Sequence, residues 1–186
     1  MNSSDLLTKD DKKFLLNLAR EAIRCAAEGI DFSSPDIYTD SLKKEQGVFV
    51  TLHKFGELRG CIGYVEALHP LQTAVEKMAL SAAFNDPRFP AVSKEELDLL
   101  VIEISVLSAL QEINDIEVIE IGTHGIIIEQ GYFRGLLLPQ VAVEYNWDRI
   151  SFLKHTCKKA GLPENAWKDK NTKIQIFSAE IFSEQD

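Results

Sequence analysis

Two segments of the chain, residues 47–65 and 126–138, have the sequence pattern of β-hairpins. In each, strand-forming residues flank a short tip that contains glycine. Helical patterns occupy three further segments: 8–30, 70–84 and 148–160. Helices before, between and after two hairpins predict an α+β fold, in which a mixed or antiparallel sheet is covered by helices. An all-helical chain or a parallel doubly wound sheet would contradict this prediction.

The three helical segments carry start and stop signals. Thr8 is a suitable N-cap, and the apolar stripe that follows it ends at Gly29. Pro70 suits the first turn of the second helix. Gly161 and Pro163 stop the third. These signals make the existence of each helix a firmer prediction than its exact boundaries.

The remaining elements are shorter. Ser93 and Glu96 form a capping-box pattern, which predicts a short helix. The other expected elements are a polar surface connector at 31–46, an ordered turn at 85–90, a strand at 99–108, a helix from Pro139 and a last strand at 173–182. We expect one bilobed domain over 8–183, preceded by a short tail over 1–7.

Charge and hydropathy exclude two classes of partner. The 186 residues include 20 Lys and Arg against 29 Asp and Glu, a formal charge of 20 − 29 = −9. Because a phosphate backbone would be repelled on average, nucleic-acid binding is disfavoured. The most apolar stretches are all much shorter than the roughly 20 residues of a membrane span. The chain begins without a signal-peptide pattern, so we expect a cytoplasmic protein.

Cysteine number and spacing indicate reduced thiols. Cys25, Cys61 and Cys157 are odd in number and far apart, which argues against a disulfide framework or a structural zinc site. The spacing of His53, Cys61 and His69 matches no common zinc pattern either. We therefore expect no metal and no cofactor.

The segment 58–63, Leu-Arg-Gly-Cys-Ile-Gly, is the strongest candidate for chemistry. Strand alternation would place Arg59 and Cys61 on one face, where the guanidinium would lower the pKa of the thiol. Gly60 and Gly63 would leave room for a ligand. The alternative is a small buried cysteine with glycines that serve packing, since free cysteine is among the most buried residue types.

A thiolate mechanism needs a base, and two histidines are candidates. His53 lies on the Cys61 face if the hairpin loop has three residues, and on the opposite face if the loop has two or four. His124 lies in a glycine-bracketed turn that could present its imidazole, or could simply bond the backbone. Farther along, Arg134 precedes a strand that runs into a helix at Pro139, where Gln140 and unpaired N–H groups could bind an anion or carbonyl. A packed strand-to-helix corner is the alternative.

Several blocks of the sequence together resemble the AMMECR family, in family order over about residues 12–183. They are Val50-Thr51-Leu52, Leu58-Arg59-Gly60-Cys61-Ile62-Gly63, Asp86-Pro87-Arg88-Phe89-Pro90, Ile104-Ser105-Val106-Leu107, His124-Gly125, Gly135-Leu136-Leu137-Leu138-Pro139-Gln140-Val141-Ala142 and Cys157-Lys158-Lys159-Ala160-Gly161-Leu162. The resemblance implies a larger and a smaller lobe with the cysteine signature near a cleft. It also implies action as one component beside a Memo-like protein and a radical S-adenosylmethionine enzyme, without naming a reaction.

These observations predict one site and two alternative functions. The predicted catalytic residues are Cys61, Arg59 and His124, and the predicted substrate-binding residues are Gly60, Gly63, Arg134 and Gln140. The first function is an enzyme, or enzyme component, that uses the cysteine as a nucleophile or thiol partner. The alternative is a non-catalytic module that binds a small ligand or a partner protein.

Overall fold

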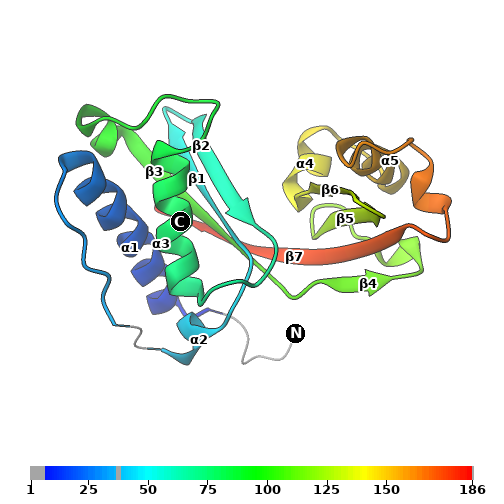
Figure 1. Cartoon of the computed structure of the whole chain (residues 1–186), viewed down its shortest axis with the longest axis horizontal. Coiled ribbons are helices and arrows are strands. Elements are labelled where there is room, and N and C mark those ends of the chain that lie inside the picture. The colour runs from blue at the N-terminus through cyan, green and yellow to red at the C-terminus, as the bar shows by residue number, and fades with distance from the viewer. Residues whose placement is uncertain (1–6, 37–38, 186) are drawn as a thin grey trace. The chain divides into compact units, whose positions relative to one another are not determined.

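The computed structural model describes residues 7–36 and 39–185 and mixes helices with antiparallel strands (Figure 1). The elements are α1 (Lys9–Glu28), α2 (Asp40–Lys43), β1 (Val48–Lys54), β2 (Glu57–Tyr64), α3 (Leu71–Phe84), the 3-10 helix η1 (Lys94–Leu99), β3 (Leu100–Leu107), β4 (Gln111–Ile113), η2 (Ile116–Val118), β5 (His124–Gln130), β6 (Phe133–Leu137), α4 (Pro139–Glu144), α5 (Arg149–Lys159), η3 (Ala166–Lys168) and β7 (Lys173–Ser183). The predicted α+β fold, with both hairpins and all three longer helices, is confirmed.

The chain divides into two compact units. Unit 1 comprises Met1–Leu107 and Glu180–Asp186, and unit 2 comprises Ser108–Ala179. Strand β7 supplies residues to both units. Residues 1–6 of the predicted tail lie outside the described residues, whereas Leu7 is buried in the core of unit 1.

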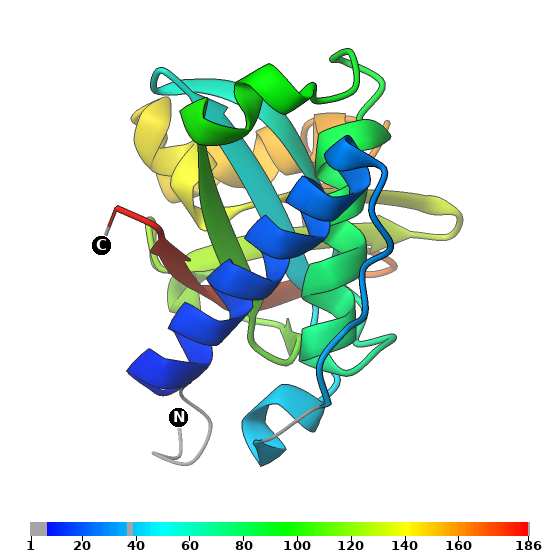
Figure 2. The ribbon, with the colours of Figure 1, turned by 90° about the vertical axis from the view of Figure 1, so that its left-hand side faces the viewer.

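Unit 1 is a sheet with two helices on one face. The strand order is β2-β1-β3, with the end of β7 beside β3. Figure 2 shows α1 and α3 lying across this sheet. The inward side chains of β1, Val48, Val50 and Leu52, are fully buried, as strand alternation requires. The other face of the same strand carries half-buried side chains, Thr51 and His53 among them.

Helix α1 begins and ends where its sequence signals predict. The Thr8 hydroxyl accepts from the Asp11 backbone N–H, and the Asp11 carboxylate accepts from the Thr8 N–H in return. Gly29 caps the C-terminus in the left-handed region, at φ 70°. Its apolar stripe packs against α3 and the sheet.

The segment 31–46 differs from the predicted surface connector. Its last part forms α2, and the single leucine of that helix, Leu42, is completely buried in the core. A single turn of helix is too short to show a 3.6-residue periodicity, so the sequence pattern gave no sign of this anchor.

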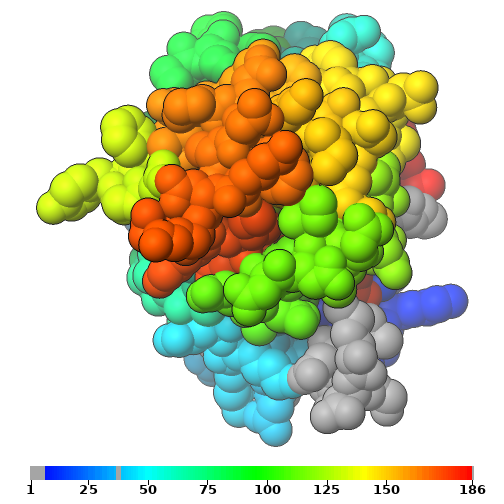
Figure 3. Space-filling view, turned by 90° about the vertical axis from the view of Figure 1, so that its right-hand side faces the viewer, coloured from blue at the N-terminus to red at the C-terminus, as the bar shows by residue number. Residues whose placement is uncertain are grey.

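Unit 2 has its own sheet, in the order β6-β5-β7-β4. Helix α5 packs on it through Phe152, Leu153 and Cys157, all fully buried. Asp148 accepts from the Ser151 N–H and caps the start of this helix. The tip of the β5–β6 hairpin, in yellow-green, projects from the surface in Figure 3, and Tyr132 at this tip is fully exposed. Within the described residues, no helix is long and apolar enough to cross a membrane.

Candidate functional site

The site is built on the β1–β2 hairpin, which has a two-residue turn and a β-bulge. Phe55 and Gly56 form the turn at φ 55° and 82°, the left-handed pair that a type I′ turn requires. The register then shifts: Leu52 pairs with Gly60, whereas His53 pairs with Leu58. One residue of β2, Arg59, therefore has no partner on β1, as in a β-bulge.

The bulge decides which side of the sheet His53 faces. In a regular hairpin with a two-residue turn, His53 would lie on the opposite face of the sheet from Cys61. Because β1 runs without interruption against β3, Thr51 and His53 share a face, and Thr51 pairs with Cys61. The extra residue in β2 thus reverses the parity, and His53 lies on the same face as Cys61.

Cys61 presents a partly accessible thiol. It is half-buried, whereas Cys25 and Cys157 are buried. The Thr51 hydroxyl donates to its Sγ at 3.3 Å. Cys61 N–H and C=O both bond to groups outside β1, so Cys61 and Thr51 form a non-hydrogen-bonded pair, in which opposite side chains come closest. The Thr51 hydroxyl is therefore the polar group in direct contact with the sulfur.

Asp86 and Arg88 hold the backbone of Cys61 from the loop after α3. The Asp86 carboxylate accepts from the Cys61 N–H at 2.9 Å, and Arg88 Nη2 donates to the Cys61 carbonyl at 3.1 Å. Arg88 also donates two hydrogen bonds to the Asp86 carboxylate, from Nε to Oδ1 at 2.9 Å and from Nη2 to Oδ2 at 2.7 Å. The three residues form one closed network at the outer edge of β2.

The charges of this network are perturbed in the directions expected for a tight ion pair. Hydrogen bonds from Arg88 hold the pKa of Asp86 well below its usual range, against the opposing effect of burial, and the Cys61 N–H lowers it further. Asp86 in turn raises the pKa of Arg88, and the Cys61 thiol contributes in the same direction. The guanidinium of Arg88 is therefore the cation that pairs with Asp86 and bonds the backbone of Cys61.

Arg59 differs from its predicted role beside the thiol. Its guanidinium forms two hydrogen bonds of 3.0 Å with the Glu96 carboxylate, which also accepts from Lys54 at 2.8 Å. Arg59, and then Lys54, lower the pKa of Glu96 to about 2. Because the bulge falls at Arg59, simple alternation does not carry this side chain to the Cys61 face.

The space beside the two glycines is filled by protein, in contrast to the prediction that it would admit a ligand. A Cβ on Gly60 would lie 2.2 Å from the Ala82 carbonyl oxygen of α3. A Cβ on Gly63 would lie 2.4 Å from the ring of Phe49, its cross-strand partner. Close packing thus accounts for both glycines, as in the alternative interpretation.

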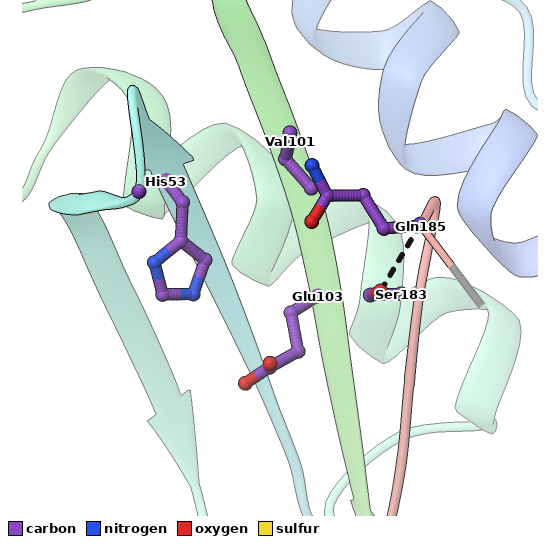
Figure 4. Close-up of a pocket in the computed structure, with 6 residues that line it drawn as sticks. His53, Val101, Glu103, Ser183 and Gln185 are labelled. Carbon is purple, nitrogen blue, oxygen red and sulfur yellow. Dashed lines mark hydrogen bonds between the residues drawn. The ribbon is translucent and has the colours of Figure 1, made fainter.

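A hollow of about 250 Å³ opens on the same face, next to His53. Glu103 and Val101 of β3 and Ser183 and Gln185 at the end of β7 also line it. In Figure 4 the His53 ring and the Glu103 carboxylate extend to the same side of the sheet. Thr51 pairs with both Cys61 and Glu103, so it lies between the thiol and this hollow.

The other predicted site residues lie in unit 2. His124 Nδ1 accepts from the Glu120 N–H at 3.1 Å. This is the alternative interpretation of His124, a turn residue that bonds the backbone. Arg134 lies 3.9 Å from Glu129 across the β5–β6 hairpin. Gln140 is half-buried near the start of α4, with its Oε1 enclosed and without a hydrogen-bond partner among the described groups. That these three meet Cys61 stays a prediction.

Sequence reasoning missed the polar partners of the signature. Asp86 and Arg88 were predicted only as part of an ordered turn, and Glu96 only as a capping residue. A signal was present, because Asp86-Pro87-Arg88 is one of the blocks that resemble the family and puts two opposite charges in one turn. Among residues 7–36 and 39–185, no cluster of three or more His, Cys, Asp or Glu is arranged to hold a metal ion.

Comparison with known proteins identifies the family and a solved structure of similar fold. The AMMECR1 family model matches residues 16–182. The chain belongs to the AMMECR1 family. Proteins of Aquifex aeolicus and Methanothermobacter thermautotrophicus are 44% and 45% identical to it, covering 95% and 96% of this chain and 94% and 96% of their own lengths. The crystal structure of an uncharacterized Pyrococcus horikoshii protein, PH0010, matches with a TM-score of 0.84 at 44% identity, covering 92% of this chain and 90% of that one.

Proposed function

We propose that this AMMECR1-family protein is an enzyme, or a component of one, in which the Cys61 thiol acts as a nucleophile or as the thiol partner of a reactive intermediate. The observation that carries the proposal is the setting of the sulfur. Cys61 is the one partly exposed cysteine of the three, its sulfur accepts from Thr51, and its backbone carbonyl accepts from the Arg88 guanidinium. A hydroxyl donor and a cation are the groups that stabilise a thiolate.

His53 is the proton acceptor that the geometry of unit 1 favours. It occupies the diagonal position to Cys61 across β1 and β2, a separation of about 7–8 Å that an aromatic side chain can bridge. Glu103 lies diagonal to His53 on the other side and could orient its ring. Catalytic hydrogen bonds often tighten only when substrate binds. His124, with Arg134 and Gln140 as donors to the substrate, is the competing assignment from the family resemblance.

The resemblance supports a role beside a Memo-like protein and a radical S-adenosylmethionine enzyme. The odd number and wide spacing of the cysteines support a cytoplasmic location. The charge of −9 supports the further proposal that neither a nucleic acid nor an acidic membrane surface is the partner. A protein partner or a small molecule is then the expected ligand.

Alkylation of the native protein tests the proposal. We expect iodoacetamide to label Cys61 of the native protein rapidly at neutral pH, as followed by mass spectrometry of the labelled peptide. Cys25 and Cys157, both buried, should react only on unfolding and serve as internal controls. His53→Gln and His124→Gln, compared for their effect on the pH profile, identify the base. A Cys61 that reacts no faster than the two buried cysteines contradicts the proposal.

A second candidate, a non-catalytic binding module, is favoured by the close packing of Gly60 and Gly63. In that function, the residues of the signature are needed only for close packing. The variant Cys61→Ala distinguishes the two functions. If the thiol does chemistry, we expect the variant to fold nearly as well as the parent but to lose the reactive thiol. If the side chain serves packing, the variant should lose roughly 1 kcal/mol or more of stability, and the parent should lack a reactive thiol.

A further inference from the structure

We propose that the substrate of the Cys61 site carries an oxyanion, a carboxylate or phosphate oxygen next to its reactive atom, and that Arg88 binds it. This inference rests on the proposed function and names the substrate class of the same site. It is carried by the orientation of the Asp86–Arg88 ion pair, by the remaining hydrogen-bonding capacity of the guanidinium and by the local excess of positive charge.

The ion pair has its negative end inside and its positive end outside. The Asp86 side chain is 1% exposed, whereas the Arg88 side chain is 53% exposed. Asp86 is also held by two backbone N–H groups, those of Cys61 and Arg88. A pair oriented in this way presents a cation to whatever approaches the thiol, because the compensating carboxylate is covered by protein.

One nitrogen of the guanidinium bonds neither Asp86 nor the Cys61 carbonyl. The bonds to Asp86 and to the Cys61 carbonyl use Nε and Nη2. Nη1 makes none of these bonds and carries two N–H groups. An oxygen of a carboxylate or phosphate is the partner that such donors bind best. The two-point grip of Asp86 fixes the plane of the guanidinium, so little side-chain freedom is lost when the anion binds.

The surroundings of Arg88 add positive charge. Two guanidinium groups lie near the ring of Phe89, that of Arg88 at 5.5 Å and that of Arg59 at 5.9 Å from its centroid. Arg59 is 9% exposed, and its Nη1 has no hydrogen-bond partner among the described residues. With Lys54, the cluster holds three cations against the two carboxylates of Asp86 and Glu96. A local excess of one positive charge stands out in a chain whose formal charge is −9.

Two alkylating reagents that differ in charge test this inference. Iodoacetate and iodoacetamide both alkylate the thiolate and release iodide, but only iodoacetate carries a carboxylate. The measured quantity is the ratio of the Cys61 rate with iodoacetate to that with iodoacetamide. The reference is the same ratio for the cysteines of the urea-unfolded chain. At low ionic strength we expect the native ratio to exceed the reference about fivefold, and to approach it in 1 M salt, where the screening length is about 3 Å.

Variants assign the effect to Arg88. Arg88→Gln should bring the ratio down to the reference or below, and Arg88→Lys should retain most of it. Arg24→Gln is the matched control, because it removes an equal charge from an exposed ion pair on α1 and should leave the ratio unchanged. If Arg88→Gln fails to fold, with Asp86 left buried and unpaired, Arg88→Lys and the salt dependence of the parent still decide. Acetate and inorganic phosphate, each compared with chloride at equal ionic strength, show which oxyanion suppresses the preference more strongly.

The two proposals fail in different ways. Slow labelling of Cys61 by both reagents contradicts thiol chemistry, yet the ratio of the two rates can still be measured and still reports on Arg88. Fast labelling by both without a preference for iodoacetate overturns the oxyanion inference alone. An unchanged ratio in Arg88→Gln overturns it as well.

Discussion

Replacing Asp86 with asparagine should be among the most destabilising conservative changes in unit 1. The buried carboxylate accepts four hydrogen bonds, from the backbone N–H groups of Cys61 and Arg88 and from Nε and Nη2 of Arg88. Asparagine has a single carbonyl oxygen, so whichever way its amide is turned, an NH₂ group faces two of these donors.

The size of the effect follows from which bonds are lost. In either orientation the amide loses one bond to a backbone N–H, worth about 1.5–3 kcal/mol to a charged buried acceptor. It also loses one bond to the half-exposed Arg88 guanidinium, discounted to about 0–1 kcal/mol for solvent screening. Together these give a loss of about 1.5–4 kcal/mol. For a chain of this length, that loss corresponds to a decrease in Tm of roughly 3–16 °C.

Urea and thermal unfolding of the parent and variant measure this loss, with Asp40→Asn as the matched control. Asp40 pairs with Lys43 on the surface with its side chain 96% exposed, so the same chemical change there should alter stability by less than about 0.5 kcal/mol. Because the pKa of Asp86 is lowered in the folded state, its contribution is present above the unfolded pKa of about 3.9 and is lost as pH falls further. The difference in unfolding free energy between the parent and Asp86→Asn should therefore become smaller at acidic pH. Equal stability of Asp86→Asn and Asp40→Asn at pH 7 would refute the reasoning.

Two further predictions concern neighbouring positions. Gly60→Ala places a Cβ 2.2 Å from a backbone oxygen of α3, and overpacking of this kind should cost about 1–3 kcal/mol in urea unfolding; an unchanged midpoint would contradict the packing explanation for this glycine. Glu96→Gln should cost about 1–3 kcal/mol at pH 7, because it weakens the grip on Arg59 and Lys54. The Glu96 pKa of about 2 lies below the unfolded value of about 4.3, so this cost should disappear as pH falls from about 4 towards 2, and a pH-independent cost would argue against the ion pair.

The secondary structure could be predicted largely from local signals. The caps at Thr8 and Gly29 bound α1, and the glycine-containing tips mark both hairpins. In contrast, Leu42 and the three-residue strand β4 were missed, because each is too short to show a periodicity. Their structure depends on what they pack against, which lies elsewhere in the chain.

The site could be predicted only in part. The signature located Cys61, but the bulge at Arg59 depends on how two strands pair and not on the composition of either one. As a result, alternation predicts Arg59 beside the thiol, whereas the Arg59 guanidinium bonds Glu96. Arg88 reaches Cys61 across 27 positions of sequence, a contact that requires α3 to return the chain to β2. Periodicity carries no information about contacts of that kind.

The way Asp86 and Arg88 occupy the border of β2 also bears on how the protein behaves at high concentration. A bare strand border offers unpaired N–H and C=O groups to any passing chain, and stacking of strands through such borders is a common route to aggregation. Here a carboxylate and a guanidinium from the same chain take up the N–H and C=O of Cys61. These two groups bond the strand as a neighbouring strand would, but they offer no backbone groups with which a further strand could pair. The residues that hold the backbone of Cys61 in place thus also block the pairing of a second molecule's strand at this point of β2.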